Sequence, residues 1–145
     1  MPYVKVYIHF VWSTKNRHPY LTTLDLREKV WKHILENAKE KGIYIDFIGG
    51  YIDHCHCLVS MGIDQTIKDL AQMIKGESSF WINKQDFCKS QFNWQNDYFV
   101  ASVSESMIDA TRNYIKNQEN HHKDRSFKDE YNDFLEKHGF KKIDD

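Results

Sequence analysis

The chain has 145 residues and a formal net charge of −1, and 41% of its residues are hydrophobic and 14% aromatic. This composition supports a hydrophobic core without disulfides and excludes an intrinsically disordered or collagen-like chain. No apolar run approaches the roughly 20 residues of a membrane helix, and the first residues do not start a signal peptide, so we expect one cytoplasmic domain spanning residues 1–145 with no membrane association.

The cysteines and the charge give two further expectations. Cys55 and Cys57 are only two residues apart and Cys88 leaves an odd count. A disulfide framework is therefore not expected, and a reducing compartment fits. The net charge does not by itself favour a nucleic-acid partner, but a local basic groove matters more than the total charge.

The chain begins with a predicted strand followed by a helix. Residues 3–12 alternate between apolar and more polar side chains, which is the pattern of a half-buried strand. Thr22-x-x-Asp25 resembles a capping box at the start of a helix. Apolar residues then recur at helical spacing until Gly42, which ends the helix.

The middle of the chain predicts three strands and a helix. Residues 43–52 form a second strand, in which Gly49-Gly50 indicates a bend or a bulge, and residues 54–61 pair with it as a hairpin. Residues 67–82 have helical apolar spacing, interrupted by a glycine that costs up to about 1 kcal/mol relative to alanine. Residues 98–104 form a fourth strand.

Two helices are predicted after the fourth strand. The first begins at Ser106-x-x-Asp109 and runs to about His122, and the second begins at Ser126-x-x-Asp129 and ends at Gly139. The order βαββαβ followed by two helices matches the ferredoxin-like α+β fold with an antiparallel sheet. In that fold both crossover helices cover one face of the sheet. We therefore expect the other face to be open and to carry the functional site.

His54-Cys55-His56-Cys57 lies in the third predicted strand. Alternate side chains of a strand share a face, so the two histidines project together, away from the two cysteines. Imidazoles in this arrangement can ligate one metal ion, and the alternative is a pair of exposed or hydrogen-bonded histidines. A zinc knuckle is disfavoured, because neighbouring cysteines and histidines point to opposite faces and no second pair completes four ligands.

Tyr114 and Gln118 lie one turn apart on one side of the predicted third helix. Spacing alone leaves two interpretations open. Tyr114 is either a packing residue of a helix that lies on a sheet, or a nucleophile with Gln118 helping to hold a metal. His121 and His122, at the end of this helix, are further ligands, phosphate contacts or part of a solvated helix end.

The combination of these motifs resembles a known family. His54-Cys55-His56 is similar to the histidine-hydrophobe-histidine motif of HUH nucleases, and Tyr114 with Gln118 resembles the nucleophile helix of IS200/IS605-type single-tyrosine transposases. Two departures are Cys55 and Cys57, which stand where Val and Leu are commoner, and Asn96-Asp97 before Tyr98, where a glycine is usual. The resemblance spans nearly the whole chain and includes residues 9–14, 53–59, 92–95 and 102–106.

The resemblance implies a DNA transposase that cleaves and rejoins single-stranded DNA at insertion-sequence ends. His54, His56 and Gln118 would bind a divalent metal ion, Mg²⁺ or Mn²⁺. Tyr114 would attack the scissile phosphate and leave a 5′-phosphotyrosine and a free 3′-OH. The implied partners are single-stranded DNA with hairpin ends and a second copy of the chain in a homodimer. Candidate contacts with the DNA backbone, each otherwise an ordinary surface charge, are Lys15, Arg17, Lys68, Lys75 and Lys84.

Two other functions stay open at this point. An RNA-recognition module would stack bases on three tyrosines of the sheet, Tyr3, Tyr7 and Tyr51, although residues 53–61 lack the usual third-strand signature of that module. A relative that binds DNA without strand transfer would retain every motif. A covalent-adduct assay separates this binder from an enzyme.

Overall fold

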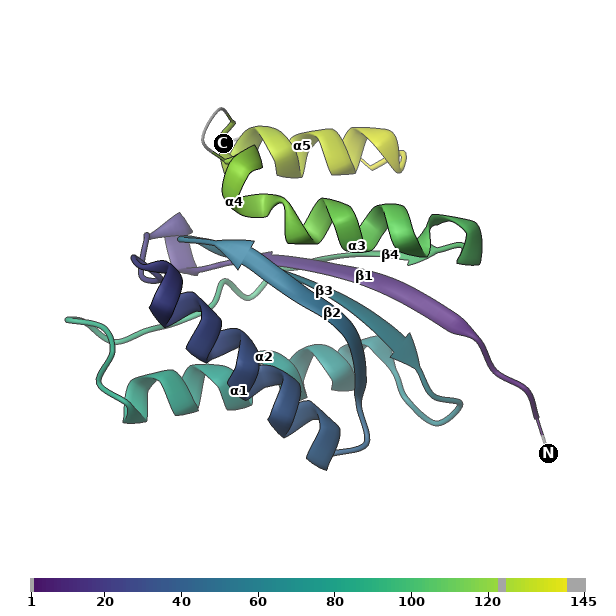
Figure 1. Ribbon diagram of the computed structural model, residues 1–145, viewed down its shortest axis with the longest axis horizontal. Coiled ribbons are helices and arrows are strands. Elements are labelled where there is room, and N and C mark those ends of the chain that lie inside the picture. The colour runs from purple at the N-terminus through teal and green to yellow at the C-terminus, as the bar shows by residue number, and fades with distance from the viewer. Residues whose placement is uncertain (1, 123–124, 141–145) are drawn as a thin grey trace.

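The computed structural model describes residues 2–122 and 125–140. Four antiparallel strands form one sheet in the order β2-β3-β1-β4, with helices on both faces (Figure 1). The predicted ferredoxin-like α+β fold is confirmed. The strands are β1 (Val6–Ser13), β2 (Tyr44–Tyr51), β3 (His54–Met61) and β4 (Phe99–Val103). The α-helices are α1 (Leu24–Glu40), α2 (Ile67–Lys84), α3 (Ile108–Lys116), α4 (Gln118–His121) and α5 (Phe127–Lys137).

Strand β1 divides its side chains between the two faces, as its alternating sequence predicts. Ile8, Phe10 and Trp12 lie in the larger core cluster, together with apolar residues of α1 and α2. Tyr7 and Val11 belong to two smaller clusters on the opposite face, beneath the C-terminal helices. Each face of the sheet therefore has a core of its own.

The second face of the sheet is covered, contrary to the expectation of an open face. Phe127 of α5 packs against Val11 and Phe99, and α3 packs over Tyr7 and its neighbours (Figure 1). The C-terminal helices have apolar stripes that must be buried, and this face of the sheet receives them. Tyr3 precedes β1 and is fully exposed. In the described part of the chain there is thus no open sheet surface for stacking bases.

The N-cap of helix α1 lies one residue later than predicted. The side chain of Thr23, and not that of Thr22, accepts a hydrogen bond from the backbone N–H of Leu26. The helix ends at Glu40, and Gly42, the predicted stop, follows with a φ of 73°. The following residue then donates its N–H to the carbonyl of Ala38 at 2.8 Å, which satisfies an otherwise free carbonyl of the last turn.

The boundaries predicted for the C-terminal helices agree less closely with the structure. The side chain of Ser126 caps α5 as predicted, and Gly139 follows its end with a φ of 80°. Ser106, however, lies inside a short 3-10 turn before α3 and does not cap it. The single helix predicted up to His122 is interrupted at Asn117, which separates α3 from α4.

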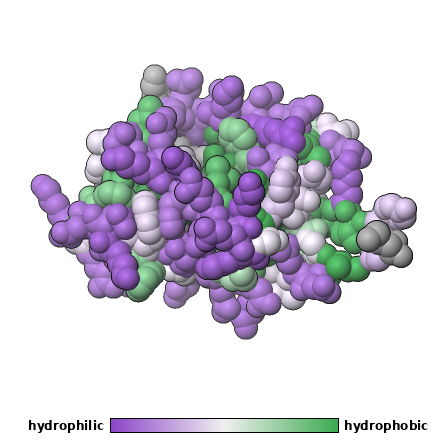
Figure 2. Space-filling model, turned by 60° about the horizontal axis from the view of Figure 1, so that its bottom comes forward, coloured by the Kyte–Doolittle hydropathy of each residue, from purple (hydrophilic) through white to green (hydrophobic). Residues whose placement is uncertain are grey.

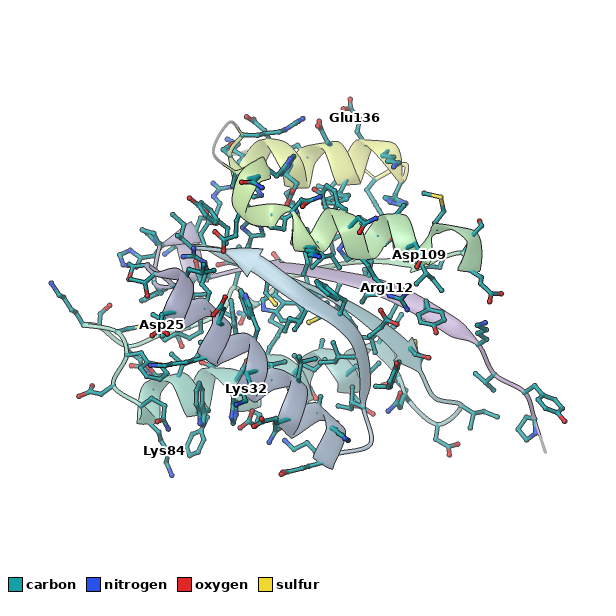
Figure 3. All side chains as sticks on the ribbon, in the orientation of Figure 1. Asp25, Lys32, Lys84, Asp109, Arg112 and Glu136 are labelled. Atoms are coloured by element: carbon teal, nitrogen blue, oxygen red, sulfur yellow. The ribbon has the colours of Figure 1, made fainter. Side chains whose placement is uncertain are left out.

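The irregularity in β2 lies at Asp46 and not at the two glycines. The register shifts between Ile45 and Phe47, whereas Gly49 and Gly50 pair regularly with β3. The bulge allows both carboxylate oxygens of Asp46 to accept hydrogen bonds from Arg112 of α3, each at 2.6 Å. Arg112 extends from α3 beside Asp109 (Figure 3). A bidentate ion pair therefore ties α3 to β2.

Gly49 is required by the close approach of α3. A Cβ atom at this position would lie 2.9 Å from Cγ2 and 3.0 Å from the carbonyl oxygen of Ile115. We expect Gly49→Ala to push α3 off the sheet and to lower the free energy of unfolding by about 1–3 kcal/mol in urea denaturation. Gly76→Ala is the matched control, because nothing lies within 4 Å of the added carbon. Equal losses in both variants would contradict this role for Gly49.

The outer surface of α1 and α2 is predominantly hydrophilic (Figure 2). None of the helices in residues 2–122 and 125–140 is both long and apolar enough to cross a membrane. Beneath these helices Cys55 and Cys57 are buried, and with the half-buried Cys88 they are free thiols, as their spacing predicts.

Candidate active site beneath the C-terminal helices

The two histidines of β3 lie at the centre of the covered sheet face. His54 and His56 alternate with Cys55 and Cys57, so the imidazoles point towards α3–α5 and the thiols towards α1 and α2. The prediction that the two histidines and the two cysteines project to opposite faces of the sheet is confirmed. Both imidazoles have 0% exposure, in contrast to the open surface that was expected for them.

His54 is fixed through both ring nitrogens. Its Nδ1 lies 2.8 Å from Oδ1 of Asp53, and its Nε2 lies 2.8 Å from Oε1 of Gln118. The ring also stacks on Phe127, with the ring centroids 4.3 Å apart. When Nδ1–H donates its hydrogen bond to the Asp53 carboxylate, the lone pair of Nε2 faces the amide oxygen of Gln118.

His56 is held between another histidine and a carboxylate. Its Nδ1 lies 2.8 Å from Nε2 of His9, and its Nε2 lies 3.0 Å from Oε1 of Glu130. Burial lowers the pKa of His56 to about 4, although the hydrogen bond with Glu130 acts in the opposite direction. The neutral imidazole is therefore the form present near pH 7.

Glu130 of α5 reaches into the middle of the site and is only 3% exposed. Its Oε2 accepts hydrogen bonds from the hydroxyl of Tyr114 and from Nε2 of Gln118, the latter at 3.3 Å. Burial alone would raise the pKa of the Glu130 carboxyl. Hydrogen bonds from His122 and His56 outweigh burial and hold this pKa well below its usual value. The carboxylate is thus ionised and shared among several donors.

Tyr114 of α3 packs against His56, and Gln118 of α4 contacts His54. They keep their one-turn spacing across the interruption at Asn117, and the amide of Gln118 also donates to the carbonyl of Tyr114 at 3.4 Å. Burial, followed by the charge of Glu130, raises the pKa of the Tyr114 phenol well above its usual value. The phenol is therefore protonated near pH 7, with a carboxylate as its hydrogen-bond acceptor.

The two histidines after α4 differ in their surroundings. Nδ1 of His122 lies 2.7 Å from the carbonyl of Arg125, and its Nε2 lies 3.2 Å from Oε2 of Glu130. His121 Nε2 lies 3.0 Å from the same oxygen but is not aligned for a hydrogen bond, and it is buried without a hydrogen-bond partner among the described residues. The His122 side chain is only 2% exposed and is not part of a solvated helix end, whereas that of His121 is 30% exposed.

The sequence model of IS200-like transposases matches residues 2–118. The chain belongs to this family. A candidate transposase from Deinococcus radiodurans R1 is 26% identical, with a TM-score of 0.60 over 81% of this chain and 95% of that one. A REP-associated tyrosine transposase bound to a REP hairpin is 17% identical, with a TM-score of 0.62 over 84% and 72% of the two chains, and this likeness concerns the fold alone. No curated protein sequence matches the chain.

The donor atoms of this IS200-like transposase fit a divalent metal ion. When the proton of His54 is on Nδ1 and is hydrogen-bonded to Asp53, the lone pairs of His54 Nε2 and Gln118 Oε1 face each other. A cation bound between these two atoms would accept both lone pairs. A second group, formed by His54, His122 and Glu130, has all its ligand atoms within 4.8 Å of one another. His54 is common to this group and to the predicted set of His54, His56 and Gln118.

The predicted DNA contacts lie on other parts of the protein. Lys68 and Lys75 line a groove beside α2, and Arg17 lines a smaller adjoining cavity. Lys15 lies in the short 3-10 helix next to Arg17. Lys84 is at the end of α2 and points away from the sheet, with its ammonium over the ring of Phe80 (Figure 3).

Sequence reasoning missed three residues of the site. Asp53 directly precedes the histidine motif, and a carboxylate next to a possible metal-binding histidine is a usable signal. His9 belongs to the alternating pattern of β1 and to residues 9–14, which resemble the transposase family, but nothing in the sequence pairs it with His56. Glu130 lies in the first turn of a capped helix, where an acid is ordinary, so its inward position has no sequence signal.

Acid should destabilise the metal-free protein partly through His56. Its folded pKa is about 4, against about 6.5 when unfolded, so between these values the unfolded chain binds a proton that the folded chain does not. The free energy of unfolding should therefore fall as the pH drops from 6.5 to 4, by on the order of 3 kcal/mol for this residue. Urea denaturation in EDTA measures the fall.

The variant His56→Gln isolates this contribution. Another histidine has the opposite effect: against burial, the hydrogen bond to Glu130 raises the pKa of His122, so protonation of His122 stabilises the folded state as the pH falls. The variant should lose less stability than the wild type over the same pH range. An identical pH dependence in the two proteins would exclude a depressed His56 pKa as the cause.

Proposed function

We propose that the chain cleaves and rejoins single-stranded DNA at the ends of an insertion sequence, with Tyr114 as the nucleophile. The observation that carries this proposal is the contact of the Tyr114 hydroxyl with Glu130, whose carboxylate also lies beside His54 and His56. A phenol with a raised pKa needs a proton acceptor before it can attack, and the ionised carboxylate is in hydrogen-bond contact with it.

In the cleavage step, the Tyr114 oxygen forms a bond to phosphorus and the bond from phosphorus to the 3′-oxygen breaks. The phenolic proton passes to Glu130, and the departing 3′-oxygen takes up a proton to become a 3′-OH. The product is a 5′-phosphotyrosine, whose bond energy is conserved. Attack by a 3′-OH on this phosphotyrosine reverses the process, restores the phenol and joins two DNA ends without ATP.

The predicted ligands of the divalent ion are His54, His56 and Gln118. When bound, the ion would polarise the scissile phosphate and neutralise developing charge. Two imidazoles and one amide oxygen suit Mn²⁺ better than Mg²⁺, which prefers oxygen ligands. Asp53 and His9 orient the two imidazoles through their Nδ1 atoms.

DNA hairpins are the proposed recognition element, since a fold relative is bound to one. A homodimer is proposed because each chain offers one Tyr114 and transposition joins two ends. Tyr114 packs against His56 of its own chain, and Glu130, which contacts its hydroxyl, also lies beside His54, so each chain carries one complete set of the proposed groups.

The test is a suicide-substrate assay with labelled single-stranded DNA that carries a hairpin from the DNA flanking the gene. With Mn²⁺ we expect a covalent protein–DNA band on a denaturing gel, and with EDTA no such band. A hairpin-specific mobility shift without any covalent band would instead indicate a relative that binds DNA without strand transfer.

A further inference from the structure

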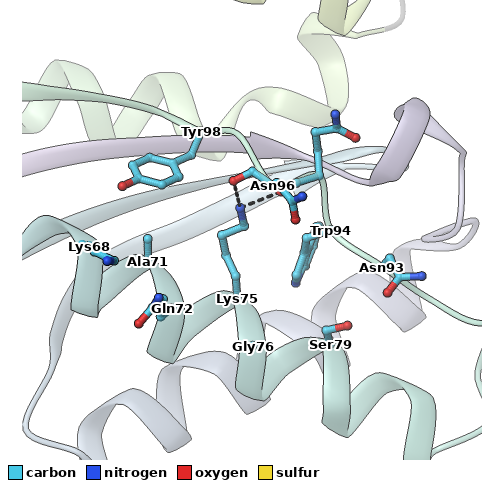
Figure 4. Close-up of a pocket in the computed structure, with 11 residues that line it drawn as sticks. Lys68, Ala71, Gln72, Lys75, Gly76, Ser79, Asn93, Trp94, Asn96 and Tyr98 are labelled. Atoms are coloured by element: carbon cyan, nitrogen blue, oxygen red, sulfur yellow. Dashed lines mark hydrogen bonds between the residues drawn. The ribbon is translucent and has the colours of Figure 1, made fainter.

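A groove of about 590 Å³ lies between α2 and the segment 93–98, on the side of the sheet away from the histidines (Figure 4). Its helix wall is formed by Lys68, Gln72, Lys75 and Ser79, which follow one side of α2 for roughly 16 Å. Trp94 and Tyr98 form part of the opposite wall. The groove thus combines amide, cationic and aromatic groups along a path as long as a few nucleotides.

Gly76 forms part of the floor of this groove, in the interior of α2. Glycine destabilises a helix interior relative to alanine. A Cβ atom at Gly76 would meet nothing within 4 Å, so no contact inside the described chain requires the glycine. A side chain at this position would instead project into the groove. The absence of one keeps the groove deep.

Lys75 provides positive charge inside the groove. Its ammonium donates to the carbonyl oxygens of Gln95 at 2.6 Å and Asn96 at 3.0 Å, and lies 5.4 Å from the centre of the Tyr98 ring (Figure 4). Both acceptors are neutral, and one of its three N–H groups is left for a ligand. Burial lowers the pKa of Lys75 to about 8, against the opposing charge of Asp97, so it is still mainly charged at pH 7.

A second cavity adjoins the groove. Gln95 lines both this groove and a smaller cavity of about 230 Å³, which is also lined by Arg17 and Phe127. The backbone N–H of Gln95 donates to Ser13 at 2.9 Å, which fixes the two loops together. Phe127 in turn stacks on His54. The two cavities therefore share Gln95, and the second is lined by the ring that covers His54.

We infer that this groove binds the single-stranded DNA that flanks the cleavage position. The inference rests on the proposed function and adds a strand-binding surface to it. Bases of a single strand have free faces that stack on an aromatic side chain such as that of the partly exposed Tyr98, whereas the bases of a duplex do not. The side chains of Lys68 and Arg17 have no hydrogen-bond or ion-pair partner within residues 2–122 and 125–140, so they are available for phosphates in the two cavities.

The first test fills the groove without weakening the helix. Gly76→Leu and Gly76→Ala are compared with the wild type for binding to fluorescein-labelled dT20 by fluorescence anisotropy, and for thermal stability by circular dichroism. We expect Gly76→Leu to weaken dT20 binding roughly tenfold and Gly76→Ala to weaken it less. Neither variant should melt below the wild type, because both residues are better helix formers than glycine. Wild-type affinity in Gly76→Leu would overturn the inference.

The second test uses salt dependence and does not alter the groove floor. Lys68→Gln and Arg17→Gln should each reduce the slope of log K against log[salt] for dT20 by about 0.7, the value for one contact with a single-stranded phosphate. Lys39→Gln, on α1 and outside the groove, is the control and should leave the slope unchanged. Equal slopes in all three variants and the wild type would also overturn the inference.

These outcomes are independent of the covalent chemistry. If wild-type protein forms no covalent adduct but the groove variants lose dT20 binding, the groove is supported and the proposed strand transfer fails. If the adduct forms while the groove variants bind dT20 normally, the proposed function stands and the groove inference fails.

Discussion

Tyr114→Phe should form no covalent adduct with single-stranded DNA in Mn²⁺, a loss of at least about 1,000-fold against the wild type. The substitution removes only the hydroxyl that contacts Glu130 and leaves the ring packed between His9, His56 and Phe134. The fold should therefore be retained, and a circular dichroism spectrum with a wild-type melting transition would show it. The measurement is the covalent band on a denaturing gel.

Tyr7→Phe is the matched control, because Tyr7 packs in the same cluster beneath α3 as Tyr114. This variant should form the adduct at the wild-type rate. A covalent band that persists in Tyr114→Phe would show that the nucleophile is another residue. Tyr98 would be the next candidate by sequence, although it lines the groove on the opposite side of the sheet.

Glu130→Gln separates the nucleophile from its proposed proton acceptor. The amide retains the size of the carboxylate but cannot take the phenolic proton, so we expect adduct formation to slow by roughly 100-fold near pH 7. Raising the pH should restore part of the rate, since hydroxide then deprotonates more of the phenol. A pH-independent loss would indicate that Glu130 only positions Tyr114.

The sequence was sufficient for those features that depend on local periodicity. Alternation along β3 predicts that His54 and His56 share a face, and helical spacing predicts that Tyr114 and Gln118 do. Gly42 and Ser126 mark helix ends because their conformational and capping preferences act within a few residues. These local rules fixed the order of the elements, and that order was enough to identify the fold.

Features that depend on contacts between distant segments were not predictable in the same way. The α5 helix has an ordinary amphipathic sequence, and nothing local indicates that it covers the histidines or that Glu130 turns inwards. The bulge in β2 lies at Asp46, whose partner Arg112 is 66 residues away in the chain. The expectation of an open sheet face failed for the same reason, since it depended on where the last helices dock.

His54→Asn should lose Mn²⁺ binding by ~100-fold or more, because His54 belongs to both groups of donor atoms in the site. Electron paramagnetic resonance of free Mn²⁺ measures this affinity without any DNA. Mn²⁺ should also raise the melting temperature of the wild type and not that of the variant, since an ion that binds only the folded state stabilises it. His33→Asn is the control, because His33 also contacts a carboxylate, Glu77, but lies between α1 and α2.

Two further variants decide between the two groups of ligands. The predicted set includes His56 and not His122, so His56→Asn should weaken Mn²⁺ binding as severely as His54→Asn, and His122→Asn should change it by less than about threefold. The opposite result would assign the ion to His54, His122 and Glu130. In that arrangement Glu130 would be a metal ligand and would no longer be free to accept the proton of Tyr114, so the same measurement also tests the proposed proton transfer.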